Sequence, residues 1–228
     1  MKSKKIKIPQ YLVHGKRQTY SVLVFSKKKW LFASYDGADE RYEIDGDPAA
    51  YQQVKYALAA LIANSGKIAY FPIRKPGFRQ FYMENYDAVL VRPELQFRRS
   101  EWVSLRRQLN KAHRIKDFEL YYDPQKLYDH YESLSHSESE MAKVWRDNYG
   151  VSSKLEDGTV FFAIYRDICY AYHHAILEAE KDVMDGRWAP IGYDVGPHAG
   201  TGYMITPGFK RFLNKEKEFE RKQNLRSK

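Results

Sequence analysis

Cysteine and long apolar runs are scarce in this chain. Cys169 is the single cysteine among 228 residues, which excludes an intramolecular disulfide and a thiolate metal cluster and is typical of a reducing compartment. No apolar run approaches the roughly 20 residues that span a bilayer. The opening MKSKKIKIP carries charge without a following apolar signal segment. We therefore expect a cytoplasmic protein that is neither exported nor inserted into a membrane.

Two catalytic signatures are missing as well. The chain has no Walker-type phosphate loop and no GxSxG motif, so nothing in it supports nucleotide hydrolysis or serine-hydrolase chemistry. His173 and His174 are adjacent. They would face opposite sides of a strand or diverge by roughly 100 degrees on a helix, and neither geometry lets both bind one metal ion easily. We predict no metal site.

Positive charge and aromatic rings are present in excess. Lysine and arginine number 38 against 29 for aspartate and glutamate, which gives a formal charge of +9. Nineteen tyrosines and four tryptophans accompany this charge, and aromatic rings stack on exposed bases. RNA or another polyanion is therefore the expected partner.

One strongly basic helix pattern begins at Ser100. This residue is a suitable helix cap, and Trp102, Leu105 and Leu109 recur at helical spacing, so we predict a helix with one buried face. Its other face supplies our candidate phosphate contacts, namely Arg106, Arg107, Lys111 and Arg114. From residue 118 onward, apolar and polar residues alternate as in a half-buried strand. The same charges also suit an ordinary solvated helix face.

Residues 1–85 predict an N-terminal α/β subregion. Residues 20–25 and 30–35 form two aromatic and β-branched runs, which we interpret as a β-hairpin across a lysine-rich turn. A helix is predicted to begin at Pro48. An apolar strand is predicted over residues 67–73.

Residues 86–228 form the larger predicted unit, which ends in a charged C-terminal helix. A helix should begin at Pro124, and residues 160–165 read as a buried strand. Residues 168–177 are ambiguous. Their composition favours a second strand, paired with the first across a turn at residues 166–167. A helical stripe is also present, formed by Ile168, Ala171, Tyr172, Ala175, Ile176 and Ala179. We predict the hairpin, and we expect both segments to form one compact unit.

The stretch GPHAGTGY is the most glycine-dense in the chain. Its glycines would let backbone amides converge on an anion without interference from side chains, although the same composition suits a flexible loop. Asp87 and Glu94 form a second candidate pattern, because paired acids hold the metal in some nucleases. Their separation of seven residues is short for that arrangement.

The succession YDAVLVRPELQFRRSEWVSLRRQLNKAHRIKDFELYYDPQKLYDHYE resembles a segment of the Fem-type peptidyltransferases, in which a strand, a basic helix, a strand and a Tyr- and Leu-rich helix follow one another. It is also similar to part of the leucyl/phenylalanyl- and arginyl-tRNA–protein transferases. The resemblance implies an α+β fold of GNAT-like type, a mixed sheet flanked by helices. It also implies that residues 160–177 form the central hairpin on which an acyl donor lies.

By this resemblance the protein is an acyl- or aminoacyltransferase that acts on an amine. The donor would be aminoacyl-tRNA rather than acetyl-coenzyme A, because Pro197 stands where a coenzyme A loop has a polar residue. Proton handling would fall to His173 or Tyr172. The donor would be positioned by the glycine-rich stretch, through His198, Gly200 and Gly202. Two alternatives remain open: a non-catalytic nucleic-acid-binding protein and a metal-dependent nuclease.

Overall fold

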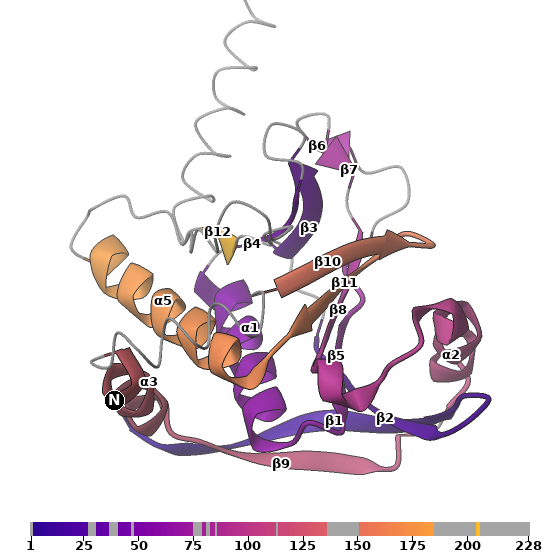
Figure 1. Cartoon of the computed structure of the whole chain (residues 1–228), viewed down its shortest axis with the longest axis horizontal. Coiled ribbons are helices and arrows are strands. Elements are labelled where there is room, and N and C mark those ends of the chain that lie inside the picture. The colour runs from indigo at the N-terminus through magenta and orange to yellow at the C-terminus, as the bar shows by residue number, and fades with distance from the viewer. Residues whose placement is uncertain are drawn as a thin grey trace, which may run out of the picture.

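The computed structural model describes residues 2–26, 31–36, 41–46, 48–74, 79–80, 83–84, 86–112, 114–135, 151–184 and 204–205. These residues form one large mixed β-sheet with helices on both faces, together with two small sheets (Figure 1). The predicted α+β class, a mixed sheet flanked by helices, is therefore confirmed.

The large sheet has seven strands in the order β10-β11-β8-β5-β2-β1-β9. Their bounds, in that order, are Val151–Glu156, Thr159–Ile164, Asp87–Val91, Lys67–Phe71, Thr19–Val24, Lys4–His14 and Lys116–Tyr122. Two neighbouring pairs are parallel, β11 with β8 and β2 with β5, and the other four pairs are antiparallel. The strands β8, β5 and β2 lie in the middle of the sheet and are largely apolar.

The small sheets contain short strands. One sheet has the order β12-β4-β3, with bounds Met204–Ile205, Arg41–Gly46 and Leu31–Asp36. The other pairs β6 (Arg79–Gln80) with β7 (Met83–Glu84).

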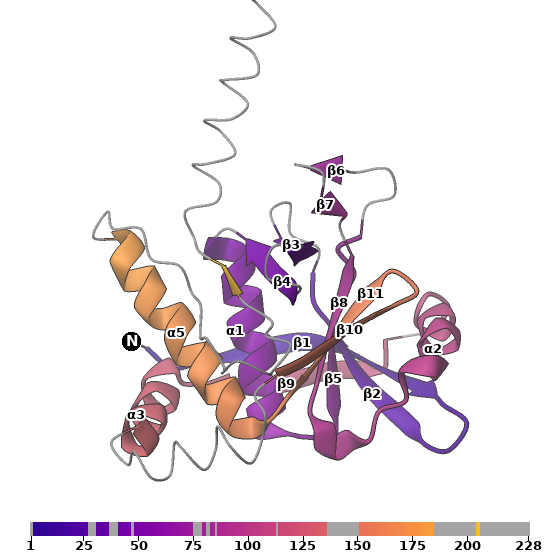
Figure 2. The ribbon, with the colours of Figure 1, turned by 45° about the horizontal axis from the view of Figure 1, so that its top comes forward.

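One face of the large sheet packs against two long helices. Helix α1 (Pro48–Ala63) lies on the sheet beside α5 (Arg166–Met184), and α3 (Pro124–Ser135) packs against α5 (Figures 1 and 2). Leu58 and Ile176 are fully buried in this core, because each helix turns its apolar side toward the sheet.

A shorter helix packs on the opposite face of the large sheet. Two 3₁₀ turns, η1 (Pro93–Leu95) and η2 (Arg99–Glu101), lead into α2 (Trp102–Leu109). Trp102 and Leu105 are buried against Tyr70, Val89 and other residues of the sheet, and they form a second apolar core.

Several predicted elements are confirmed. Helix α1 begins at Pro48, and α3 begins at Pro124 with the side chain of Asp123 as its cap, since the Lys126 N–H donates to Asp123 Oδ1 at 3.1 Å. In β9 the alternation is as expected: Leu120 is buried while Tyr121 is exposed.

The predicted hairpin of residues 20–25 and 30–35 is wrong. Strand β2 pairs with β1 and β5. Strand β3 pairs with β4 instead, and the other neighbour of β4 is β12. The physical reason is the opening segment, which is an eleven-residue strand, Lys4–His14. Residues 10–14 of this strand pair with residues 19–23 and Val13 is buried beside Val22, so β1 takes the place beside β2 that a hairpin would give to β3.

The predicted strand over residues 168–177 is also wrong, because these residues lie in α5. The helical stripe prevails since Ile168, Tyr172 and Ile176 all become buried against the core. Strand β11 instead pairs with β10 through a tight turn at Asp157 and Gly158, whose φ angles are 48° and 68°. An Asp-Gly pair between two strand patterns is a strong hairpin signal, and this signal in the sequence indicates the true hairpin.

Both predicted segments contribute to the large sheet. Strands β1, β2 and β5 precede residue 85, and the remaining four strands follow it. The glycine-rich stretch with His198, Gly200 and Gly202 lies outside the described residues, and so does the charged C-terminal helix.

Candidate polyanion-binding site

Arg106, a predicted phosphate contact, is partly buried and paired with carboxylates of the protein itself. Its Nη2 lies 2.6 Å from Asp157 Oδ2, and its Nη1 lies 3.6 Å from Asp87 Oδ2. Helix α2 places the guanidinium above the β10–β11 turn, where both carboxylates converge on it. We call Asp87, Arg106 and Asp157 the arginine cluster.

Asp87 has further partners that fix it in place. The Tyr70 hydroxyl donates to Oδ2 at 2.9 Å, and the backbone N–H of Arg74 donates to Oδ1 at 2.8 Å. Burial and the neighbouring Asp87 charge raise the pKa of Tyr70, so its hydroxyl stays a proton donor. Because these bonds hold the Asp87 carboxylate in place, Asp87 and Asp157 together compensate the positive charge of Arg106.

The other three predicted contacts are exposed. Arg107 lies on the outer side of α2, while Lys111 and Arg114 follow the end of that helix at Leu109. Arg114 forms an ion pair with Asp117 on β9. The predicted cationic face is therefore divided between a helix and the segment that follows it.

His173 and Tyr172, the predicted proton-handling residues, lie in the core. Their exposed fractions are 1% and 2%. His173 Nε2 lies 3.0 Å from the Tyr122 hydroxyl. Burial, with smaller contributions from the charges of Lys55 and His174, lowers the pKa of His173 to about 3, so the ring is neutral at physiological pH.

Asp87 and Glu94 do not meet. Asp87 is the first residue of β8, whereas Glu94 lies in η1 beyond the other end of that strand. Glu94 pairs with Arg92, with Oε1 2.5 Å from Nη2. Among the described residues, no group of three or more His, Cys, Asp or Glu side chains is placed to hold a metal ion.

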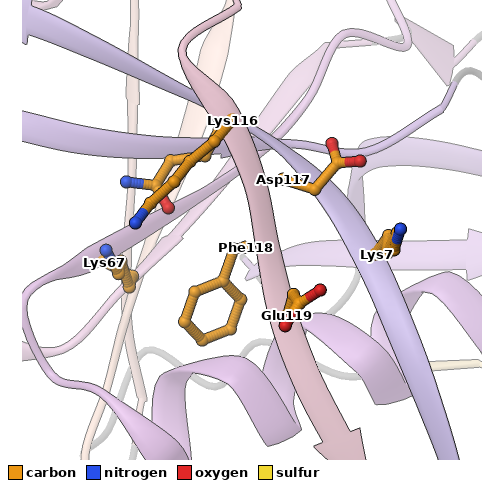
Figure 3. Close-up of a pocket in the computed structure, with 7 residues that line it drawn as sticks. Lys7, Lys67, Lys116, Asp117, Phe118 and Glu119 are labelled. Carbon is orange, nitrogen blue, oxygen red and sulfur yellow. The ribbon is translucent and has the colours of Figure 1, made fainter.

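A different set of basic residues surrounds a cavity of about 610 Å³ where β1, β9 and the start of β5 approach one another. Its lining consists of Lys7, Gln10, Lys67, Lys116, Asp117, Phe118 and Glu119. We call this cavity the lysine hollow. Figure 3 shows the side chains of Lys67 and Lys116 converging from two strands beside the ring of Phe118.

The sheet itself brings these lysines together. Lys67 opens β5 directly after the turn from α1, and it lies opposite Ser21 in the register of β2. Lys116 opens β9 and lies opposite Gln10 of β1. Because strands β2 and β1 separate β5 from β9, the two long side chains reach across the sheet from either side.

The electrostatics of the hollow favour an anion. The Lys67 ammonium donates to Ser21 Oγ at 3.0 Å and lies 5.3 Å from the centroid of Phe118. Partial burial and the positive charge of Lys116 lower the pKa of Lys67. Neither lysine forms an ion pair within the described part of the chain. A bound anion would relieve this repulsion.

The two acidic residues of the lining are already neutralised. Asp117 pairs with Arg114, and Glu119 Oε2 lies 2.7 Å from Lys5 Nζ. Lys7 stands opposite Glu119 in the pairing of β1 with β9 and acts on that carboxylate. Lys67 and Lys116 therefore contribute the positive charge that no carboxylate of the lining balances.

Sequence reasoning missed these lysines because they are far apart in the chain and none belongs to a motif. A weak signal exists, since Lys67 and Lys116 each stand at the start of a strand pattern.

Comparisons with known proteins add no assignment: no family model, no curated protein and no solved structure matches this chain. In the described residues, no helix has both the length and the apolar character that crossing a membrane requires.

Proposed function

We propose that this protein binds single-stranded nucleic acid, RNA in the first place, through the lysine hollow. The observation that carries the proposal is the convergence of Lys67 and Lys116, without ion-pair partners among the described residues, in a cavity of about 610 Å³. A volume in this range suits a small ligand group. Phosphates supply the negative charge that the lysines lack, and the attraction does not depend on sequence.

A single strand suits the surface better than a duplex does. The hollow is a concave site that contains a half-buried aromatic ring, Phe118, among the lysines. Basic grooves with interleaved aromatic residues are typical of proteins that bind unpaired strands. Lys111 and Arg107 are exposed outside the hollow and would contact phosphates farther along a bound strand.

The GNAT-like transferase hypothesis has lost its main support. It required a hairpin over residues 160–177 to carry the acyl donor, and residues 166–184 form α5 instead. Because the described residues also bury His173 and Tyr172, they offer no exposed proton-handling group from that prediction. Binding without catalysis is the function that the geometry favours.

A salt titration tests the proposal. The double variant Lys67→Ala/Lys116→Ala is compared with wild type by fluorescence anisotropy on a labelled single-stranded RNA at several salt concentrations. If each lysine contacts one phosphate, the slope of log K against log salt becomes less negative by about 1.4, at about 0.7 per contact.

A matched control removes the same charge elsewhere. Lys126 on α3 and Lys154 on β10 are both exposed and do not line the hollow. The double variant Lys126→Ala/Lys154→Ala should keep the wild-type slope. Equal losses in both double variants would show that only net charge matters, and the assignment of the hollow would be rejected.

A further inference from the structure

A second cavity lies next to the lysine hollow, at a place where the large sheet opens. Pairing between β1 and β2 ends at Gln10 and Leu23, but β1 continues beside β9 as far as Lys4. Beyond Val24, the segment that follows β2 stays beside β5, since the Phe25 N–H donates to the Tyr70 carbonyl at 2.9 Å. The two strands therefore separate, and we call the space between them the strand gap.

The strand gap has a volume of about 410 Å³, and α1 closes one side of it. Its lining consists of Ile6, Lys7, Ile8, Pro9, Tyr11, Val24, Phe25, Ser26, Gln53 and Tyr56. Most of these side chains are apolar or aromatic. The lining thus differs from the lysine hollow, which is dominated by charge.

Besides Lys7 and the hydroxyls of Tyr11 and Tyr56, the mostly apolar lining contains two polar side chains, Ser26 and Gln53. The Ser26 hydroxyl donates to Gln53 Oε1 at 3.3 Å. In the described structure this bond leaves the N–H groups of the Gln53 amide without a partner. A flat apolar ligand with hydrogen-bond acceptors on its edge would satisfy both features.

Lys7 connects the two cavities, because it lines both of them. It stands between Ile6 and Ile8 on β1, so the charged and the apolar lining meet at one strand. A ligand that places an anionic group at Lys7 therefore has an apolar cavity within reach.

We infer that the strand gap receives a base of the nucleic acid whose phosphates lie in the lysine hollow. The combination of an apolar slot, aromatic rings and one free amide matches the way proteins hold an unstacked base, by stacking and by hydrogen bonds to its edge. This inference rests on the proposed function, and it adds that the bases contribute affinity as well as the phosphates.

Abasic RNA separates the two statements. Wild-type protein is titrated with a labelled oligouridylate, a labelled oligoadenylate and a ribose-phosphate oligomer of equal length that lacks bases. We expect the abasic strand to bind about 5- to 150-fold more weakly than at least one of the base-containing strands, which is the range of one stacked base. Equal affinities for all three strands would overturn the inference and leave the proposed function intact. Failure of every strand to bind would overturn both.

Two variants test whether the contribution of the bases to affinity arises in the strand gap. Val24→Trp fills the gap from the half-buried end of β2, and Gln53→Leu removes the amide while leaving the packing volume similar. Each should reduce the preference for bases and leave the affinity of the abasic strand unchanged. Gln125→Leu on the exposed side of α3 is the matched control for Gln53, and it should keep the wild-type preference. If Val24→Trp does not fold, Gln53→Leu still decides the question, and an unaltered preference in it would refute the base site.

An acyl chain is the competing occupant, since a fatty acid also joins an anionic head to an apolar body. Oleate and vesicles with phosphatidic acid are therefore titrated in parallel. Saturable oleate binding that Gln53→Leu leaves unchanged, combined with equal affinity for abasic and base-containing strands, would assign the gap to lipid and overturn the inference.

Discussion

The arginine cluster and the lysine hollow place positive charge in opposite circumstances. In the cluster, Arg106 lies between two carboxylates, and Asp87 is itself held by Tyr70 and a backbone N–H. In the hollow, Lys67 and Lys116 repel each other and form no ion pair among the described residues. The same charge sign therefore stabilises the fold in one region and remains available to a ligand in the other.

This difference explains why a count of basic residues says little about binding. The formal charge of +9 includes residues such as Arg106 that are compensated internally. Burial decides which basic residues are compensated internally, because a charge that is removed from water must be paired. Substitutions at compensated and at uncompensated basic residues should therefore have different effects on stability and on binding.

Replacing Arg106 by alanine should destabilise the protein strongly, because Asp87 would remain buried without its cation. We expect a loss of about 3 kcal/mol in the free energy of unfolding, measured by urea denaturation. Arg107→Ala, the same change one residue later on the exposed side of α2, should stay within about 0.5 kcal/mol. Equal stabilities of the two variants would contradict the division between a structural and a surface arginine.

His173 extends the comparison to a group that is buried and neutral. Its pKa in the folded protein is about 3, whereas an unfolded histidine titrates near ~6.5. The folded-state pKa is depressed, so the unfolded chain binds the extra proton first. The contribution of His173 to stability is complete above about pH 6.5 and declines as the pH falls toward 3. At pH 4.5 the protonation of this histidine in the unfolded chain should have lowered the free energy of unfolding by about 3 kcal/mol.

The measurement is urea denaturation of wild type and His173→Gln at pH 7.5 and pH 4.5. Glutamine keeps a polar partner for the Tyr122 hydroxyl but does not titrate in this range. The variant should lose less stability on acidification than wild type does. The same pH dependence in both proteins would show that other groups, such as the exposed carboxylates, cause the decline.

Gly158 tests the turn that supports the arginine cluster. Its φ of 68° is unfavourable for residues with a Cβ, and an added Cβ would overlap the guanidinium of Arg74. Gly158→Ala should therefore cost about 1–2 kcal/mol. Gly66→Ala, at a turn without these constraints, should cost less than about 1 kcal/mol. A larger loss at Gly66 than at Gly158 would argue against this geometry.

Lys116→Ala should have the smallest effect on the fold and a clear effect on binding. Because Lys116 is exposed and forms no described ion pair, stability should change by less than about 0.5 kcal/mol. The salt slope of RNA binding should become less negative by about 0.7. The pKa of Lys67 should rise, since one cause of its depression is removed, and NMR titration of the lysine side chains can follow this rise. A destabilised Lys116→Ala variant with an unchanged salt slope would reverse the comparison.

Local sequence patterns correctly predicted those helices and strands whose formation depends on neighbouring residues and not on a particular packing partner. Pro48, the Asp123–Pro124 start and the alternation around Leu120 are properties of neighbouring residues, and the structure confirms the elements they predict. Residues 168–177 were different, because their composition fitted a strand and their spacing fitted a helix. The structure resolves this conflict in favour of the helix, since α5 buries its apolar stripe on the core beside α1.

The sequence alone determined the α+β composition, the positive charge and most of the helix starts, since these depend on residue type and on contacts within a few positions. Only the tertiary structure decided which charges are compensated and which are left for a ligand. Lys67 and Lys116 meet because β5 and β9 join one sheet. Arg106 is compensated within the protein because the β10–β11 turn brings Asp157 to it. Pairings between distant segments follow from the burial of the whole chain, and no local pattern in the sequence encodes them.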